Sequence, residues 1–265
     1  MPIDIATVEQ FVRDAPRDVE LYKACRSYVW RFDGENDPEP ATNGEWRTLA
    51  EFMPQCRVVF DVGANTGAWS ETVLSLNPAL EIHAFEPARD SFARLAARQL
   101  PPQVRRNNVG LGAVVEQRTL FAIGADTEMR SLYPRAGLED YGMLPTAGEA
   151  VPITTLDDYC RSAGIATIDY LKIDTEGHDL QVLRGAADLI GRRAIRCIQF
   201  EYGSANADSR DLLKDFFAFF EGTPYRLHKI HPEGRQHFAR YNVRLENFQY
   251  QNWLALLGNQ EGAAA

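Results

Sequence analysis

The sequence is poor in cysteine and has no excess of positive charge. Its four cysteines, Cys25, Cys56, Cys160 and Cys197, lie far apart, and no two of them form a CxxC pair. This spacing predicts neither a disulfide framework nor a zinc site, so we expect buried free thiols. Lys and Arg number 28 against 37 Asp and Glu, which gives a net charge of 28 − 37 = −9. Because binding phosphates requires clustered Lys and Arg, nucleic acid is not an expected partner.

Long apolar runs are missing as well. No stretch approaches the ~20 apolar residues that cross a bilayer, so we expect no membrane span. The N-terminal stretch has neither the basic start nor the apolar run of a signal peptide, which favours a cytoplasmic protein. Aromatic residues are plentiful (14 Phe, 10 Tyr and 4 Trp), and they exclude disorder throughout the chain. A chain of 265 residues can bury this material in a single domain.

Composition divides the chain into three parts. Residues 1–33 repeat apolar residues at loosely helical spacing, and a turn-rich acidic stretch, DGENDPEPATNGE, follows at 33–45. We therefore expect a helical N-terminal extension and linker over 1–45, a main domain over 46–258 and a disordered tail over 259–265. The N-terminal helices are a candidate contact for a homo-oligomer.

Strands alternate with helices through the main domain. The clearest strands are RVVFD, LEIHAFEP, IDYLKID and IRCIQFEYG. This alternation predicts an α/β fold with a doubly wound, mostly parallel sheet. Further strands are expected within 104–123 and at 224–230 and 247–257, and helices at 178–190 and 208–221. The stretch HKIHPEGRQH, with His228, His231 and His237, has irregular spacing and few acids, so we expect a loop there and no metal site.

Carboxylates stand at the ends of the clearest strands. In doubly wound sheets, ligands bind beyond the carboxyl ends of the strands. The acids at these ends are Asp61, Glu86, Asp174, Glu176 and Glu201. We expect them to converge on one rim, which is the predicted binding site.

The loop after the first strand, DVGANTG, predicts the kind of ligand. It has glycines at Gly63 and Gly67 but Asn65 where a dinucleotide-binding loop has a second glycine, and it lacks the GK[ST] of a Walker loop. Glu86 follows Asp61 at the end of the second strand, where an acid can accept the hydroxyls of a ribose. A nucleoside without a pyrophosphate is therefore expected. S-adenosylmethionine fits, because its sulfonium and ammonium groups tolerate an acidic lining.

Several ordered blocks over about residues 57–202 resemble the FkbM-type S-adenosylmethionine-dependent methyltransferases. VVFDVGANTGAWS resembles the first cofactor block of this family, and HAFEPARDSFARL resembles its ribose block. NNVGLG is similar to the segment that lines the adenine. VPITTLDDYC followed by IDYLKIDTEGHDLQVLRGA resembles the most distinctive block, and Ser131-Leu132 resembles a short Ser-Leu element. The resemblance implies a Rossmann-like, seven-stranded fold of the class I methyltransferase type.

The resemblance also implies roles for individual residues. Glu86 would bind the ribose and Asn108 the adenine edge, while Asp174 would lie near the amino-acid part of the cofactor, close to the methyl group that is transferred. The methionine end of the cofactor site would be shaped by Asp61, Gly63, Asn65 and Gly67. His178, in EGHD, departs from the family pattern, in which a small or aromatic residue is as common.

Methylation of a hydroxyl requires a group that removes its proton. The candidates on the rim are Asp174, Glu176, His178 and Glu201. His178 has the most suitable ordinary pKa, near 6.5; the alternative is a surface residue in the first turn of a helix. Asp174, Glu176 and Glu201 are also candidates for binding Mg²⁺ or Ca²⁺, which prefer oxygen ligands, and the alternative is a structural role for these acids.

The stretch 124–150 is too long for an ordinary connection, which favours a lid or binding loop over the acceptor. Its apolar residues Met129, Leu132, Tyr133, Tyr141 and Met143 suit an apolar or ring-shaped acceptor, and Arg130 and Arg135 suit an acidic group. The alternative is a poorly ordered excursion of the chain.

The residues and the resemblance together indicate an O-methyltransferase that acts on a small molecule, with a sugar or natural-product hydroxyl as acceptor. One alternative is a nicotinamide-dependent oxidoreductase on a similar fold, against which Asn65 and the LKIDTEG block argue. Another is a non-catalytic module that keeps the nucleoside pocket without turnover.

Overall fold

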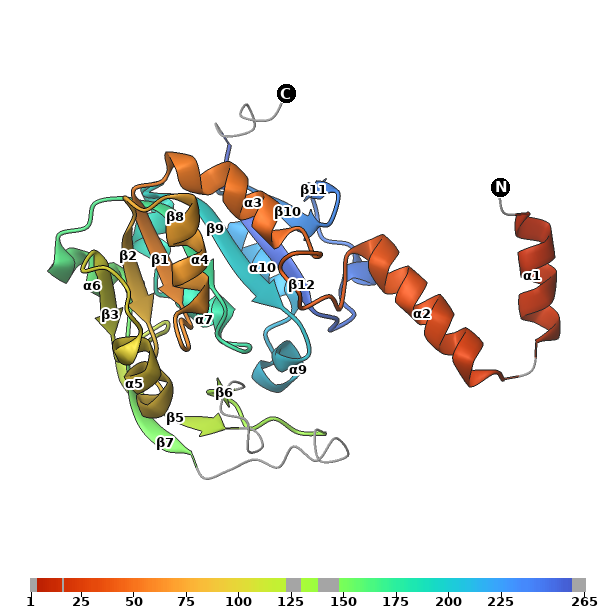
Figure 1. Ribbon diagram of the computed structural model, residues 1–265, viewed down its shortest axis with the longest axis horizontal. Coiled ribbons are helices and arrows are strands. Elements are labelled where there is room, and N and C mark those ends of the chain that lie inside the picture. Colours follow the sequence, from red (N-terminus) through yellow and green to blue (C-terminus); the bar gives the residue numbers. More distant parts are fainter. Residues whose placement is uncertain (1–3, 16, 123–129, 138–147, 259–265) are drawn as a thin grey trace.

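The computed structural model describes residues 4–15, 17–122, 130–137 and 148–258. Figure 1 shows a central sheet with helices on both faces, a smaller sheet beside it, and two N-terminal helices that extend away from this body. The predicted tail and part of the predicted lid, including Met129, Tyr141 and Met143, lie outside the described residues.

The main sheet has eight strands within the described residues, in the order β11-β10-β12-β9-β8-β1-β2-β3. Their bounds are β1 Val58–Val62, β2 Glu81–Phe85, β3 Val104–Asn107, β8 Ile168–Ile173, β9 Ile195–Tyr202, β10 Tyr225–His231, β11 Gly234–Phe238 and β12 Gln251–Leu257. Strands β3, β2, β1, β8 and β9 run parallel, and β12, β10 and β11 continue the sheet in antiparallel pairs. The predicted doubly wound, mostly parallel α/β fold is confirmed.

The expectation of seven strands is wrong by one strand. The additional strand is β11, which forms a hairpin with β10 and places His228 opposite His237. The stretch that the sequence predicted as a loop is therefore this hairpin, turning just before Gly234, whose φ is +145°. The sequence did not predict this pairing, because β11 is a partly exposed outer strand whose residues do not alternate regularly between apolar and polar.

Helices pack on both faces of the main sheet. The helices have the bounds α3 Glu45–Phe52, α4 Ala68–Leu76, α5 Arg89–Ala97, α6 Leu156–Ala163, α7 Asp179–Arg184, α8 Ala187–Gly191, α9 Ala205–Ser209 and α10 Leu213–Phe220, with short 3₁₀ turns at Met53–Gln55 and Val243–Leu245. One core cluster joins α3, α4 and α5 to the sheet, and the other joins α6, α7, α8 and α10 to the opposite face. Successive side chains of a strand point to opposite faces of the sheet, so neighbouring residues such as Val59 and Phe60 of β1 pack into different core clusters.

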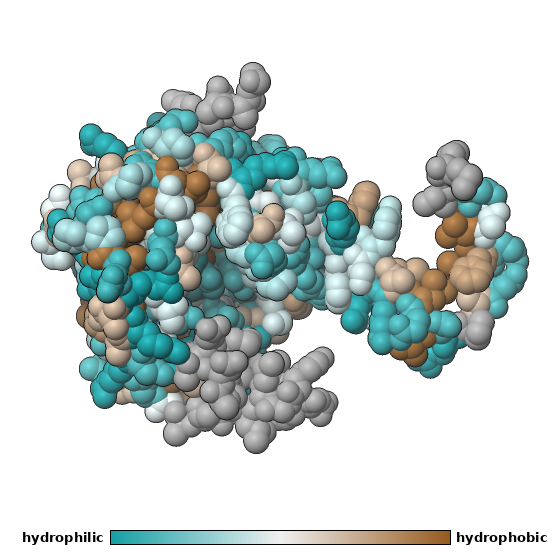
Figure 2. All heavy atoms as spheres, viewed as in Figure 1, coloured by the Kyte–Doolittle hydropathy of each residue, from teal (hydrophilic) through white to brown (hydrophobic). Residues whose placement is uncertain are grey.

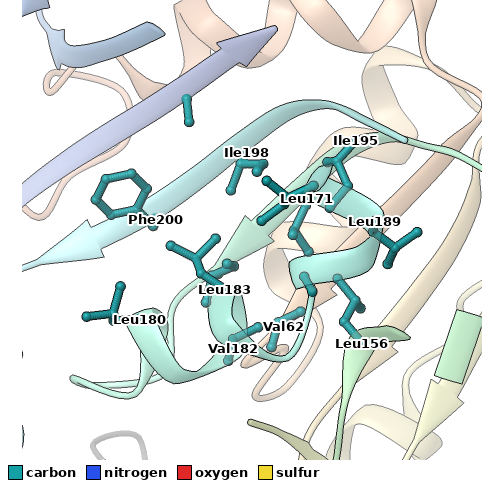
Figure 3. Close-up of a cluster of buried hydrophobic side chains, with 14 of the residues drawn as sticks. Val62, Leu156, Leu171, Leu180, Val182, Leu183, Leu189, Ile195, Ile198 and Phe200 are labelled. Carbon is teal, nitrogen blue, oxygen red and sulfur yellow. The ribbon is translucent and has the colours of Figure 1, made fainter. Parts of the chain in front are cut away.

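The larger core cluster fixes the helices next to the carboxyl ends of β1 and β8. Figure 3 shows Leu171, Ile198 and Phe200 of the sheet against Leu180, Leu183 and Leu189 of α7 and α8. The helix predicted over 178–190 is divided into α7 and α8 near Gly185. A Cβ atom at Gly185 would lie 2.0 Å from the carbonyl oxygen of Gly112, so the chain passes too closely there for any other residue.

The smaller sheet has the strand order β4-β7-β5-β6 and lies beside the carboxyl edge of the main sheet (Figure 1). Its strands are β4 Gly110–Leu111, β5 Glu116–Ala122, β6 Arg130–Ser131 and β7 Glu149–Thr154. Within residues 104–122, where the sequence predicted further strands, the structure has three: β3 in the main sheet, and β4 and β5 in the smaller one. The last strand of this sheet, β6, belongs to the segment predicted as a lid.

The N-terminal extension consists of α1 (Ile5–Asp14) and α2 (Val19–Asp33), as predicted. Asp4 and Asp18 cap their N-termini through side-chain hydrogen bonds, and Gly34 ends α2 in the left-handed region. Cys25 on α2 is exposed, which corrects the expectation of four buried thiols; Cys56, Cys160 and Cys197 are buried. Among the helices described, none has the length and apolar character needed to span a membrane.

Candidate functional site

A cavity lies at the carboxyl ends of β1, β2 and β8, on the rim that the sequence predicted. Its empty volume is about 760 Å³ with its open mouth included. The residues that line it are Val62, Gly63, Asn65, Phe85, Glu86, Pro87, Ser91, Gly110, Leu111, Leu120, Arg130, Leu132, Asp174, Thr175, Glu176 and His178. The cavity therefore brings together residues from both sheets.

The loop after β1 forms one wall of the cavity. The backbone N–H groups of Gly63 and Ala64 donate to the carbonyl of Phe85, which ties the loop to the end of β2. Gly63 has a φ of +80°, and a Cβ atom there would lie 1.8 Å from the carbonyl oxygen of Asp174. Glycine is therefore required where β1 and β8 approach. Gly67, also with positive φ, stands at the N-terminus of α4 and packs on Leu95, outside the lining.

Asn65 and Glu86 meet at this wall. Glu86 accepts hydrogen bonds from the backbone N–H of Asn65 at 2.8 Å and of Ala88 at 2.9 Å, and burial raises the pKa of its carboxyl group. Asn65 has a φ of +47°, and its Oδ1 is buried with no hydrogen-bond partner among the described residues. A buried acceptor without a partner on the wall of a cavity is a position where a ligand donor would be stabilised.

Asn108 supports the wall from behind. Its Nδ2 donates to the carbonyl oxygens of Glu86 (2.9 Å) and Pro87 (3.1 Å), and its side chain is not among those that line the cavity. The contacts of this side chain thus fix the backbone that follows β2.

A buried lysine, which the sequence reasoning missed, joins two of the predicted acids. Lys172 Nζ lies 3.3 Å from Asp61 Oδ1 and 3.3 Å from Asp174 Oδ2. Burial opposes its charge, but the carboxylates of Asp174 and Asp61 outweigh that effect and raise the pKa of Lys172. Asp61 also accepts from Ser70 Oγ at 2.7 Å and lies behind the cavity wall, whereas Asp174 lines the cavity. A charged residue inside the apolar strand YLKID was the signal available in the sequence.

Glu176 lies in the strained turn after β8. Its φ is +52°, and that of the following Gly177 is +94°. Burial and the neighbouring Asp174 carboxylate raise the pKa of Glu176 to about 7. Arg135 Nη1 donates to its Oε2 at 3.1 Å. Glu176 is therefore a cavity-lining carboxyl group that titrates near neutral pH.

The segment 130–137 closes one side of the cavity. Ser131 Oγ donates to the carbonyl of Glu176 at 2.7 Å, and Arg130 pairs with Glu149 at 3.2 Å. Arg135 is buried and also contacts Asp208 at 3.0 Å and Ser204 at 2.9 Å. Leu132 and Arg130 line the cavity. This part of the predicted lid is thus fixed to the turn after β8 and to α9.

His178 is buried at the start of α7. It is the N-cap residue of α7 without a side-chain capping bond, and it is 2% exposed, so it is not a surface residue. Its Nδ1 is hydrogen-bonded to Tyr133 Oη at 2.8 Å, while its buried Nε2 has no partner among the described residues. Burial, with the nearby Arg118 guanidinium, lowers the pKa of His178 to about 4. His178 was a candidate base because of its ordinary pKa near 6.5, and its pKa in the folded protein is well below that value.

A metal site is not supported. Within the residues that the structure describes, no group of three or more His, Cys, Asp or Glu side chains could hold an ion. Asp174 is paired with Lys172 and Glu176 with Arg135, so their charges are already compensated by the protein. Glu201 is not among the cavity-lining residues, and its backbone N–H donates to Asp179 at 3.0 Å.

Sequence comparison relates the chain to known methyltransferases. The family model described as "Methyltransferase FkbM domain" matches residues 61–242. The chain is 33% identical over 155 residues, 49% of its length, to 31-O-demethyl-FK506 methyltransferase FkbM of Streptomyces tacrolimicus. It is 25% identical over 154 residues, 55% of its length, to 2-O-methyltransferase NoeI of Sinorhizobium fredii (strain NBRC 101917 / NGR234). The matches span 60% and 63% of those proteins' own lengths.

The solved structures that resemble the chain include methyltransferases, at low sequence identity. Methyltransferase FkbM from Methylobacillus flagellatus KT is 12% identical, with a TM-score of 0.43 over 76% of this chain and 43% of that chain. The O-methyltransferase TomG from Streptomyces achromogenes, solved in complex with SAM, is 13% identical, with a TM-score of 0.43 over 96% of each chain. The family model, by contrast, matches more than half of the 265 residues and includes the carboxyl end of β1 together with β2 and β8, which border the cavity. This chain therefore belongs to the FkbM methyltransferase family.

Proposed function

We propose that the chain binds S-adenosylmethionine in the cavity at the ends of β1, β2 and β8 and methylates a hydroxyl group of a small molecule. The observation that carries this proposal is the cavity itself. It combines the close glycine approach at Gly63, the buried Oδ1 of Asn65 with no partner among the described residues, and three lining carboxyl groups, those of Glu86, Asp174 and Glu176. An acidic, partly apolar cavity without a phosphate-binding loop suits a cationic nucleoside, so the residues present fit this cofactor.

Each wall would hold a different part of the cofactor. Glu86, fixed by two backbone N–H groups, would accept the ribose hydroxyls, and the apolar residues Pro87, Leu111 and Leu120 would cover the base. Asp174 would attract the ammonium group. The Gly63–Gly67 loop would leave room for the methionine end. Asp61 and Asn108 would act indirectly, Asp61 through Lys172 and Asn108 by fixing the backbone after β2.

When bound, S-adenosylmethionine supplies an electrophilic methyl group on a sulfonium. The chain must hold the acceptor oxygen in line with that methyl group and accept the hydroxyl proton as the new O–C bond forms and the S–C bond breaks. We assign the proton to Glu176. It lines the cavity, has a pKa raised to about 7, and is held by Arg135 through one carboxylate oxygen, Oε2. His178 is the weaker candidate, because Tyr133 occupies its Nδ1 and its pKa is low.

The acceptor would enter beside the segment 130–137. Leu132 offers an apolar contact and Arg130 a charged one on the cavity wall. The printed names of both curated relatives place the methyl group on an oxygen atom, 31-O in one and 2-O in the other. These names favour O-methylation, and a hydroxyl of a sugar or natural product is the substrate class that we propose.

Cofactor binding tests the first part of the proposal. Purified protein should bind S-adenosylhomocysteine with micromolar affinity and gain thermal stability from it, because the ligand binds the folded state. Glu86→Ala should weaken binding by roughly 1.5–3 kcal/mol, the range for hydrogen bonds to a charged group. Glu221→Ala, which removes an exposed carboxyl group at the end of α10 and outside the cavity lining, is the matched control in the same calorimetric titration. Tight binding of NAD⁺ and none of S-adenosylhomocysteine would show that the proposal is wrong.

The pH–rate profile tests the assignment of the base. With a panel of hydroxylated glycans and polyketides as acceptors and methyl transfer as the readout, the wild-type rate should rise through pH 7. Glu176→Gln should lower kcat by about 10²–10⁴ and remove this rise, with cofactor affinity little changed. His178→Gln should keep the rise. A profile that disappears in His178→Gln and persists in Glu176→Gln would reverse the assignment.

A further inference from the structure

The two N-terminal helices expose an apolar surface that the other described residues do not cover. Neither α1 nor α2 has a buried residue. Nine large hydrophobic side chains on them are at least 43% exposed: Ile5, Val8, Phe11, Val12, Val19, Tyr22, Tyr28, Val29 and Phe32. Figure 2 shows apolar residues gathered where α1 and α2 face each other, and a groove lined by Val12, Ala15, Val19 and Tyr22 lies between them. A surface of this kind marks a contact site.

The spacing of this surface indicates the shape of its partner. Apolar residues recur at intervals of three or four along each helix, at Ile5, Val8 and Val12 of α1 and at Val19, Tyr22 and Val29 of α2. Arg26 stands at the remaining position of this series, with its guanidinium over the rings of Tyr22 and Trp30. A seam with this period packs against another helix, because the seam keeps to one side of each helix. The partner is therefore expected to be helical.

The arm formed by α1 and α2 leaves the body from a fixed base. Glu35, directly after the Gly34 cap, is buried and paired with Lys229 of β10 at 2.6 Å. It also accepts hydrogen bonds from Asn247 (2.9 Å) and Gln251 (3.1 Å). The end of α2 is held as well, because the ring of His231 contacts the carbonyl of Phe32 at 3.1 Å. A fixed base lowers the entropy lost when the arm binds a partner.

The two helices carry opposite net charge. Residues 4–15 hold Asp4, Glu9 and Asp14 against Arg13, which gives 1 − 3 = −2. Residues 17–33 hold four basic residues (Arg17, Lys23, Arg26, Arg31) against three acids (Asp18, Glu20, Asp33), which gives 4 − 3 = +1. In a two-fold pair of arms, α1 of each copy can therefore lie on the α2 of the other with opposite charges facing. A self-complementary patch of this type is what a two-fold dimer uses.

We propose that the arm is a dimerisation element, in which the seams of α1 and α2 pack against the same helices of a second copy of this chain, α1 against α2. A lipid surface suits the arm less well. The arm has a net charge of −2 + 1 = −1 on a chain of −9, whereas helices that bind anionic lipid carry an excess of Lys and Arg. The proposal does not depend on the proposed reaction, because its test measures mass and not activity.

The oligomeric state of the full chain tests this proposal directly. Sedimentation equilibrium should give twice the chain mass of 29.8 kDa for the wild type. Val12→Asp places a charge in the seam of both copies and should weaken the dimer at least ~100-fold. Val243→Asp, the same change at a 74% exposed valine of the body, is the control and should remain dimeric. Circular dichroism should show equal helix content in all three proteins, because Val12 is exposed in the single chain.

Charge reversal tests the α1-to-α2 pairing. Glu9 and Lys23 each directly follow a seam residue, Val8 and Tyr22. Glu9→Lys alone and Lys23→Glu alone should each weaken the homodimer by about 3–30-fold, because both symmetric contacts then oppose like charges. An equimolar mixture of the two variants, or the double variant alone, should restore wild-type association.

Three outcomes would overturn the proposal. They are a monomeric wild type at every concentration, a dimer that Val12→Asp leaves intact, and a monomer that instead binds vesicles of anionic phospholipid. If single reversals leave the dimer unchanged, the pairing of α1 with α2 is wrong even where the arm is the interface.

Discussion

His178 illustrates how burial changes the chemistry of a residue whose sequence position suggests catalysis. The imidazole is 2% exposed, bonded to Tyr133, and close to the Arg118 charge. These surroundings disfavour the protonated, positively charged form of the imidazole and lower the pKa of His178 to about 4. His178 is therefore neutral at physiological pH, and it connects the turn after β8 with the segment that carries Tyr133.

The pKa of His178 leads to a prediction about stability in acid. Between pH 4 and 6.5 the unfolded chain, with a histidine pKa of about 6.5, binds a proton that the folded chain excludes, so stability falls as the pH falls. His178→Gln removes this uptake. The difference in free energy of unfolding between wild type and variant should change by about 3 kcal/mol from pH 7 to pH 4. This figure follows because the histidine pKa is about 6.5 in the unfolded chain and about 4 in the folded chain, and one pKa unit corresponds to about 1.36 kcal/mol.

Urea unfolding at several pH values measures this difference. His237→Gln is the matched control, because His237 is exposed on β11. The same pH dependence for wild type and His178→Gln would mean that the imidazole is protonated in the folded protein.

At the scale of elements, the segment 130–137 behaves as part of the fold where the structure describes it. Arg135 is 4% exposed and contacts Glu176, Asp208 and Ser204, which belong to the turn after β8 and to α9. A buried cation shared by two carboxylates holds three pieces of chain together. The segment predicted as a lid thus has an anchored portion beside the cavity.

Arg135→Met should release this portion. The change leaves Glu176 and Asp208 without their cation, and breaking a buried pair of this kind costs about 3–5 kcal/mol. Hydrogen exchange should accelerate at the amides of Tyr133 and Ala136, which donate to Ser131 and Asp208. S-adenosylhomocysteine should also bind more weakly, because the segment supplies part of the cavity wall.

Arg161→Met provides the comparison for Arg135→Met. Arg161 pairs with Asp158 on α6, and its side chain is 69% exposed, so its loss should be nearly neutral. Equal exchange rates in both variants would indicate that the segment is held by its backbone and by Leu132 alone.

At the scale of the whole molecule, the base of the arm is part of the body. Glu35 and Asn43 are buried, and Asn36 bonds to Tyr250. We therefore propose that the extension is limited to residues 5–33 and that the methyltransferase domain includes the turn-rich stretch after it. The boundary at residue 45 was predicted from amino-acid composition alone. The contacts of Glu35 in the structure instead join the stretch after α2 to β10 and β12.

Lys229→Met should destabilise the whole protein. It leaves the Glu35 carboxylate buried without its cation, at a cost of about 3–5 kcal/mol. Adding Glu35→Gln should recover much of the loss, because the buried charge is then removed. Urea unfolding of the two variants measures the difference, and a double variant no more stable than Lys229→Met would show that the charge is not the cause.

The sequence by itself determined the order of most strands and helices and the edge of the sheet at which the candidate site lies. Alternating strands and helices fix a parallel sheet, since only crossovers return the chain to the same edge, and the acids at the carboxyl ends of β1, β2 and β8 then share that edge. Asp61, Glu86, Asp174 and Glu176 could be placed from local pattern alone. The N-terminal helices were likewise visible from their period.

Tertiary structure decided what each of these residues contacts. Three of these contacts join residues that are 41 or more positions apart in the sequence: Lys172 with Asp61, Arg135 with Glu176, and His178 with Tyr133. Lys172 and Asp174, by contrast, lie at the same strand end. Burial and charge at such contacts set the pKa values that separate Glu176 from His178. No local pattern encodes them, because electrostatic energy depends on distance and solvent exposure in the folded chain, and these exist only once the strands have been brought together.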